Sequence, residues 1–214
     1  MKKTMKSFVI IAVLAIVSVG TANAQLGVQA GYVSSKFVAE DSEADPYNGF
    51  NVGLTYDMAI QGGFGLHYGL LYTLISDKES VKETLPILGD VEVTYKSSGH
   101  FLNIPVQATY KYAINSDFGI FAYAGPNFTM GVAGSEKISY SIAEAGDDGK
   151  ASWYGEDDGI DFGRFDIQLG VGLGIQYSNF VLKGGYDWGL LNPYGDDDFK
   201  INRNQFNVSL GFLF

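Results

Sequence analysis

The chain has 214 residues and a formal net charge of minus 10, and it contains no cysteine, 28 glycines, 14 tyrosines and 15 phenylalanines. The acidic balance argues against a nucleic-acid partner, which needs a basic face. No disulfide can form, and two histidines without any cysteine make a transition-metal site improbable. The many glycines and aromatic residues suit a membrane β-barrel, although a soluble all-β protein can share this bias.

Residues 1–24 have the features of a secretory signal peptide. Three lysines within the first six residues form a positive start, Phe8–Val19 is an apolar run, and Ala22–Ala24 is a small-residue cleavage site. The alternative is an uncleaved anchor, but the run is shorter than the roughly 18 to 20 apolar residues that span a bilayer. We expect cleavage between Ala24 and Gln25, and one outer-membrane β-barrel domain over residues 25–214.

Period-two alternation of apolar residues predicts eight strands, because side chains in a strand point to opposite faces in turn. The least regular strand is the fifth, in which Phe121 and Tyr123 have one parity while Phe128 and Met130 have the other. A bulge near Gly125-Pro126 would switch the face there. The predicted strands are Leu26–Tyr32, Phe50–Met58, Phe64–Leu74, Leu102–Tyr112, Phe118–Val132, Phe165–Tyr177, Phe180–Leu190 and Phe206–Phe214.

The connections between these strands alternate between short and long. Short turns are expected at Gln61–Gly63, Asn115–Asp117 and Ser178–Asn179, and long loops over Ser35–Gly49, Ser76–Gly99, Ser135–Asp161 and Leu191–Arg203. Short periplasmic turns opposite long external loops are typical of bacterial barrels. The predicted fold is therefore all-β: an eight-stranded antiparallel transmembrane up-and-down β-barrel with four long external loops.

Most of the acidity falls in the long loops. Without the three lysines near the start the net charge is minus 13, and the four long loops together carry minus 12 of it. Such acids are usually solvated, but divalent cations could bridge them to lipid phosphates or surface sugars.

The last nine residues form a strictly alternating strand that ends on an aromatic residue. Phe206, Val208, Leu210, Phe212 and Phe214 share one face, which needs an apolar environment. The free edge of this strand also needs a partner, and closure against Leu26–Tyr32 in a lipid-embedded barrel supplies it. The segment resembles the C-terminal signal that outer-membrane barrels present to the insertion machinery.

The inner face of the predicted barrel carries glycines and a few charged residues. Eight strands enclose a lumen that side chains can fill, so a diffusion porin is not expected. Arg164, Asp166, Lys183 and Asp187 lie on the inner face of adjacent strands, and their opposite signs predict a structural ion-pair network. A proton or ion path is the alternative. Asp57, His67 and Lys111 are expected to be further polar members of the interior.

No cofactor or metal site is predicted. Gly170–Gly174 resembles part of a nucleotide-binding loop, but it lies inside an alternating strand and no helix follows it. The acidic runs Asp147-Asp148 and Glu156–Asp158 lack the ligand spacing of an EF-hand.

Four segments resemble the PorT-like family of outer-membrane β-barrel proteins: Leu102–Tyr112, Tyr123–Pro126, Asp166–Gln176 and Asn207–Phe214. The resemblance extends over residues 25–214 and implies the barrel fold. Some members of that family are linked to secretion across the outer membrane, and no catalytic residue carries over to this chain. A shared fold does not decide function.

We expect a non-enzymatic outer-membrane barrel that serves surface interaction or envelope stability. The third external loop, Ser135–Asp161, is the expected contact surface because Tyr140, Trp153 and Tyr154 lie among its acids. The expected partners are outer-membrane lipid, the insertion machinery, and a surface or secretion-complex protein.

Three alternatives remain open from the residues alone. One is an accessory component of a secretion or transport assembly. Another is a lipid-modifying enzyme built on Ser97, Ser98 and His100, and the third is a soluble barrel of the lipocalin type. The polar and glycine-rich inner face argues against this last fold, which needs an apolar cavity.

Overall fold

A computed structural model describes residues 24–39, 42–43, 45–85, 89–141, 149–154, 163–192 and 201–214. Within these ranges it contains ten strands and no helix long and apolar enough to cross a membrane. The strands are β1 (Ala24–Ala39), β2 (Ser42–Glu43), β3 (Tyr47–Gln61), β4 (Phe64–Leu85), β5 (Gly89–Ala113), β6 (Phe118–Tyr140), β7 (Gly149–Ser152), β8 (Phe165–Tyr177), β9 (Phe180–Gly189) and β10 (Ile201–Leu213).

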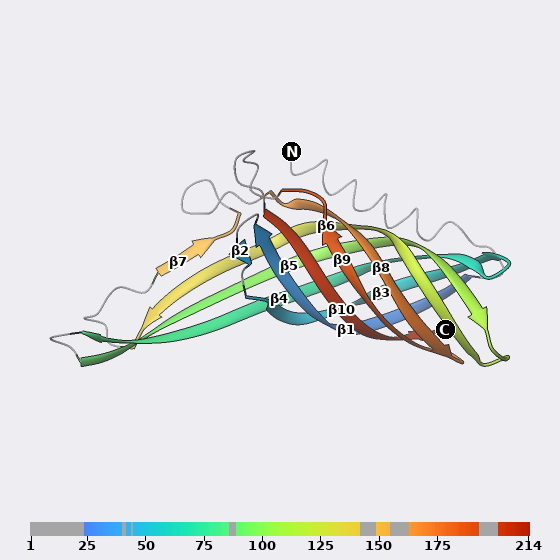
Figure 1. Ribbon diagram of the computed structural model, residues 1–214, viewed down its shortest axis with the longest axis horizontal. Coiled ribbons are helices and arrows are strands. Elements are labelled where there is room, and N and C mark those ends of the chain that lie inside the picture. Colours follow the sequence, from blue (N-terminus) through green and yellow to red (C-terminus); the bar gives the residue numbers. More distant parts are fainter. Residues whose placement is uncertain are drawn as a thin grey trace.

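Eight of these strands close into an antiparallel ring. Neighbours follow the order β1, β3, β4, β5, β6, β8, β9 and β10, and β10 pairs with β1 to complete the circle. The closing register runs from Gly27 opposite Leu213 to Ala39 opposite Ile201. The predicted barrel and the predicted pairing of the last strand with the first are thus confirmed (Figure 1).

The outward face of the ring is apolar. Its exposed large side chains include Leu26, Val28, Phe50, Leu54, Phe64, Val106, Ile120, Leu173, Leu182, Phe206, Leu210 and Phe214. Such a continuous exposed apolar surface is unfavourable in water and fits the hydrocarbon of a bilayer. The alternating sequence therefore places its apolar residues toward lipid, as predicted, and its polar residues toward the lumen.

Tight turns join β3 to β4, β5 to β6 and β8 to β9 at one end of the barrel, on the right in Figure 1. The long connections lie at the other end, as predicted, but strand residues occupy part of each predicted loop. The loop Ser35–Gly49 includes the end of β1, all of β2 and the start of β3, and the loop Leu191–Arg203 includes the start of β10. The other two loops differ most. The predicted loop Ser76–Gly99 is a hairpin, because β4 and β5 stay paired from Ser76 opposite Ser98 to Leu85 opposite Gly89. Part of Ser135–Asp161 is also strand, since β6 continues to Tyr140 and pairs with β7.

Residues 76–85 of β4, 89–98 of β5 and 135–140 of β6, together with β7, are called the external sheet below. A membrane strand needs about 9 to 11 residues. By contrast, β4, β5 and β6 have 22, 25 and 23. The surplus projects beyond the barrel as a sheet of four strands, whose long members reach past the other strands in Figure 1.

The irregular strand β6 is bulged, but not where the sequence suggested. Its pairing with β8 continues without a shift through Gly125 and Pro126. The register against β5 instead shifts between His100 opposite Ala133 and Phe101 opposite Gly131, which leaves Val132 as the extra residue. Phe121 and Tyr123 therefore face the lumen, and the expected bulge at Gly125-Pro126 is wrong.

These two lumen aromatics explain the glycines on the neighbouring strands. A Cβ added to Gly172 would overlap the Tyr123 ring, and one added to Gly174 would overlap the Phe121 ring. The glycines of β8 therefore make room for aromatic rings from β6, as well as for the long polar groups that the sequence suggested. Residues 1–23, which include most of the predicted signal peptide, lie outside the described residues, while Ala24 and Gln25 begin β1 opposite Met58 and Asp57.

Candidate functional site

Three polar side chains bridge the lumen near the end of the barrel at which the tight turns lie. Asp57 on β3 lies directly opposite His67 on β4, and Asp57 Oδ1 is 2.9 Å from His67 Nδ1. Lys183 on β9 approaches from the other wall, with its Nζ 2.8 Å from His67 Nε2. The ammonium donates to Nε2, so the Nδ1 proton is left to donate to Asp57.

This bridge spans the full width of the ring. Four steps separate β4 from β9 in either direction around the eight strands, so the two strands are diametrically opposite. A direct hydrogen bond between opposite walls closes the lumen at that level. Lys183 also lies 5.5 Å from the centre of the Tyr123 ring, which covers the ammonium from the β6 side.

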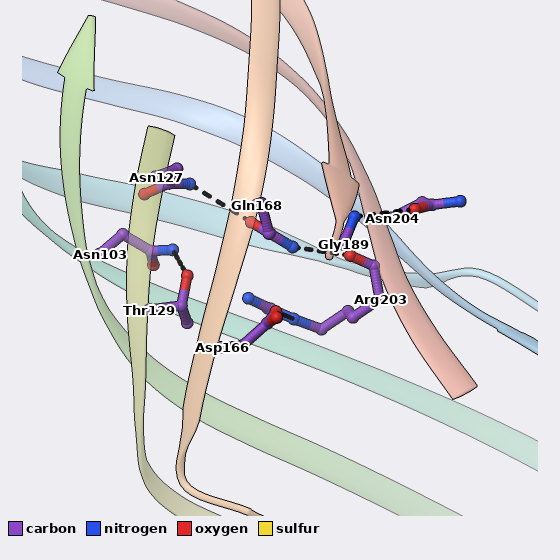
Figure 2. A network of polar contacts seen from close by, with 8 residues as sticks. All are labelled: Asn103, Asn127, Thr129, Asp166, Gln168, Gly189, Arg203 and Asn204. Atoms are coloured by element: carbon purple, nitrogen blue, oxygen red, sulfur yellow. Dashed lines mark hydrogen bonds and ion pairs between the residues drawn. The ribbon is translucent and has the colours of Figure 1, made fainter. Parts of the chain in front are cut away.

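A second polar cluster lies nearer the external end, and Figure 2 shows it. Gln168 on β8 is fully buried, accepts from Asn127 and donates to the Arg203 carbonyl at 2.7 Å. Arg203 Nε lies 3.5 Å from Asp166 Oδ2. The Arg203 guanidinium is also 4.3 Å from the centre of the Phe101 ring on β5, which is again the strand opposite its own.

Two small cavities lie in the described part of the lumen, one beside the bridge and the other between the bridge and the second cluster. One has a volume of about 20 Å³ and is lined by His67, Tyr123 and Lys183 among others. The other has a volume of about 30 Å³ and lies beside Asn103, Asp187 and Gln205. A cavity needs roughly 10 to 15 Å³ to hold one water molecule. These spaces therefore fit one or two waters each and form no wide aqueous pore.

Aromatic and aliphatic side chains close the external mouth. Trp153 is 3% exposed and packs with the buried Val33, Ile75 and Phe101, while Phe37 and Tyr47 meet its ring edge-on at 6.1 and 6.2 Å. Gly99 and Gly134, which are directly paired, make the slot: a Cβ on either would lie 2.5 Å from the indole. The prediction that Trp153 belongs to an exposed contact surface is wrong, because the indole is the plug of the barrel.

The four residues expected to form one lumen network are divided in the structure. Asp166, Lys183 and Asp187 are buried, with Asp166 near Arg203, Lys183 near His67, and Asp187 accepting a 3.0 Å hydrogen bond from Asn207. Lys111, also expected inside, is exposed at the turn end and donates to Gln176.

Arg164 does not lie where the sequence placed it. The strand begins one residue later, so Arg164 is exposed at the mouth, where it stacks 4.6 Å from the centre of the Tyr154 ring. Its guanidinium donates to the carbonyls of Gly131 and Val132 at the bulge, at 3.4 and 3.3 Å. This position corrects the expectation of a lumen role for Arg164.

Sequence reasoning missed Arg203 and Tyr123. Arg203 is the last residue of the predicted loop Leu191–Arg203, although its parity with Gln205 and Ser209 places it on the inner face of the last strand. The predicted bulge at Gly125-Pro126 would place Tyr123 on the same face as Phe128 and Met130, whereas Tyr123 faces the lumen. The glycines opposite it on β8 were the available signal for an inward ring.

The residues considered for an enzyme are not assembled into a catalytic group. Ser97 and His100 are three positions apart on β5, so they point to opposite faces. Ser98 faces the same side as His100, but its Oγ contacts Ser135 Oγ at 3.3 Å, and His100 Nδ1 hydrogen-bonds with the Tyr72 hydroxyl. Within the described ranges, no group of three or more His, Cys, Asp or Glu residues could hold a metal ion.

Comparison with solved structures finds several outer-membrane barrels at low identity. Ail, the attachment invasion locus protein of Yersinia pestis, in complex with the heparin analogue sucrose octasulfate, is 17% identical with a TM-score of 0.44, over 90% of this chain and 99% of Ail. Neisserial surface protein A is 16% identical with a TM-score of 0.42, over 90% and 99% of the two chains. OprG from Pseudomonas aeruginosa is 13% identical with a TM-score of 0.41, over 91% and 98%.

No curated protein matches the sequence. The family model of the outer membrane protein beta-barrel domain matches residues 18–194, which is most of the chain. With the closed ring and its apolar outer band, this match shows that the chain belongs to the outer membrane protein beta-barrel domain family and is a protein of the bacterial outer membrane.

Proposed function

We propose that this protein is a non-enzymatic, non-conducting barrel that acts in surface interaction through its external sheet. The observation that carries the proposal is a contrast within one chain. The lumen is closed by contacts between opposite walls, Lys183 with His67 and Arg203 with Phe101, whereas β4, β5 and β6 continue well beyond the membrane. Binding by such a molecule takes place on the projecting sheet.

The inner face of the external sheet suits protein binding better than the edge of the sheet does. Val81 and Tyr95 lie on this face, are 40% and 47% exposed, and have Glu79 beside them. Exposed aromatic and aliphatic groups with a charged rim are typical of protein interfaces. Beyond Ser76, no strand among the described residues pairs with the β3 side of β4. This edge carries Lys78, Glu79 and Lys82. Charges of this kind discourage strand addition, so a face of the sheet serves better than its edge.

Shortening the hairpin tests this proposal. Residues 78–96 are replaced by Asn-Gly, which suits a two-residue hairpin turn. The shortened barrel is expected to keep its heat-modifiable gel mobility, since the ring below the hairpin is untouched. Cells that carry the shortened barrel are expected to lose their binding to surface proteins. A matched variant, Val81→Ser with Tyr95→Ser, keeps the sheet and removes only the apolar contact. If the shortened chain and the double-serine variant both bind as well as the wild type, the proposal is contradicted.

A periplasmic partner is the second candidate, and one cavity favours it. At the turn end a cavity of about 380 Å³ is lined by Asp57, Lys111 and Gln176 among others. It suits a segment of an assembly component, in line with the resemblance to PorT-like proteins. Co-purification from native membranes, repeated with Lys111→Glu, tests this role. It is abandoned if no protein co-purifies with the wild-type chain.

We further propose roles for the two ends of the domain. Phe206, Val208, Leu210, Phe212 and Phe214 face outward on and after β10 and would form the signal that the insertion machinery reads. Cleavage after Ala24 would leave Gln25 as the first residue, within β1. The buried lumen charges are assigned a structural role, because each of them contacts a side chain from another strand.

A further inference from the structure

Four lysines form one line across the external sheet. Lys78 on β4 is directly opposite Lys96 on β5, Lys96 is opposite Lys137 on β6, and Lys137 is opposite Lys150 on β7. Directly opposed residues share one face of a sheet, and adjacent strands are about 4.8 Å apart. The four ammonium groups therefore leave the same face in a row, called the lysine row below. All four side chains are exposed.

The lysine row has no internal compensation. In the part of the chain that the structure describes, none of the four ammonium groups has an ion pair within 4.0 Å or a hydrogen bond to another side chain. Like charges placed directly opposite each other destabilise a sheet. Although the chain has a net charge of minus 10, four of its cations lie directly opposite one another on the external sheet. An anion that binds along the row would relieve this repulsion.

Hydroxyl groups flank the lysine row on both sides. Two residues toward the membrane, Ser76, Ser98, Ser135 and Ser152 form a parallel row on the same face. Two residues away from the membrane lie Ser80, Thr94 and Ser139. Lysine donates as a point charge and hydroxyls donate single hydrogen bonds, which together suit phosphate oxygens.

The position of the lysine row indicates that its ligand is a lipid headgroup. Lys78 has the same parity on β4 as Phe64 and Leu74, so it lies on the lipid side of the strand. It follows Leu74 by four residues, which is about 13 Å along a strand and less in height because barrel strands tilt. The lysine row therefore stands at the level of the outer-leaflet headgroups, above the apolar band.

We infer that the lysine row binds the phosphate groups of phosphorylated glycolipid in the outer leaflet of the outer membrane. Anionic headgroups attract lysines held close to the membrane surface. The row lies on the outward face, opposite to the Val81 and Tyr95 surface of the proposed function. Lipid binding by the row is therefore separate from the proposed protein binding and goes beyond that function.

The test compares two variants that remove the same charge. Lys96→Gln with Lys137→Gln removes the centre of the row. Lys82→Gln with Lys111→Gln removes two exposed lysines outside it, one of them opposite Glu92 and the other at the turn end. Each protein is refolded in neutral detergent, checked by heat-modifiable mobility, and titrated with lipopolysaccharide before and after enzymatic removal of its phosphates. Native mass spectrometry counts the bound glycolipid.

We expect the wild-type chain to bind the phosphorylated form, and the row variant to bind it about 30-fold more weakly, if each lysine contributes as it does near an anionic membrane surface. The control variant should bind like the wild type. Equal affinity for dephosphorylated glycolipid, or equal weakening in both variants, overturns the inference. Full displacement by inorganic phosphate, or a preference for a soluble sulfated polysaccharide over the glycolipid, overturns it as well.

Failure of this inference is distinguishable from failure of the proposed function. The row variant leaves Val81 and Tyr95 unchanged, so binding to surface proteins is expected to persist in it.

Discussion

Charged groups in the lumen and on the external sheet obey opposite rules. In the lumen, Lys183 contacts His67, and Arg203 lies between Asp166 and the Phe101 ring. On the external sheet, four lysines line up with each other. Burial imposes a desolvation cost that only a partner offsets, whereas water screens exposed charges. Unpaired charges in register are therefore tolerated only on the exposed sheet, where a ligand can reach them.

Breaking the Arg203 contact should have the largest effect. Arg203→Ala leaves the Asp166 carboxylate buried with its cation removed, which costs about 3 to 5 kcal/mol. The free energy of unfolding is measured by urea titration of the barrel in lipid vesicles. The control is Lys111→Ala, an exposed lysine hydrogen-bonded to Gln176, which should change stability by less than about 0.5 kcal/mol. Equal losses in the two variants would refute the assigned difference between inside and outside.

The neighbouring glycines Gly184 and Gly185 lie on opposite faces of β9, one toward lipid and one toward the lumen. A Cβ on Gly185 would overlap the Tyr123 hydroxyl in the lumen, whereas the nearest atom to a Cβ on Gly184 is 3.6 Å away. Gly185→Ala should therefore lose about 1 to 3 kcal/mol through overpacking, and Gly184→Ala should be nearly neutral. Thermal unfolding followed by gel mobility separates them. A loss at Gly184 that matched the loss at Gly185 would count against a filled lumen.

The smallest effect concerns the lysine row and has the opposite sign. Lys96→Thr removes one of the central charges and should stabilise the external sheet by about 0.2 to 1 kcal/mol in neutral detergent, since opposed like charges repel. Lys82→Thr is the control, because Lys82 lies opposite Glu92 and its loss should not stabilise. Hydrogen exchange of the sheet amides measures the change. Faster exchange in Lys96→Thr would show that repulsion across the row is negligible.

Alternation of side chains predicted the ring because lipid imposes it on every strand. Outward residues from Leu26 to Phe214 must be apolar, and this requirement leaves a readable period of two. The same period does not predict the external sheet. Above the membrane the outward positions are Ser and Lys, and the apolar residues Val81 and Val93 lie on the inner face instead. Outward apolar residues therefore predict only the part of each strand that lies in lipid, although β4, β5 and β6 continue beyond it.

The candidate sites depend on register, which local pattern does not supply. Asp166 was recognisable as an inner residue, but its partner Arg203 comes from another strand, and the pairing depends on how β8, β9 and β10 are aligned. The lysine row is a stronger case, because its members lie on four strands and form a line only through three separate alignments. No single stretch of sequence contains that information.

The contact between Lys183 and His67 also sets an order of events. Because β4 and β9 are as far apart around the circle as two strands can be, we expect the two side chains to meet after β10 has joined β1. The contact is therefore a late event in assembly, and interactions that form after the transition state govern how fast a protein comes apart rather than how fast it forms. We therefore expect loss of the bridge to speed the unfolding of a finished barrel and to leave its insertion rate unchanged.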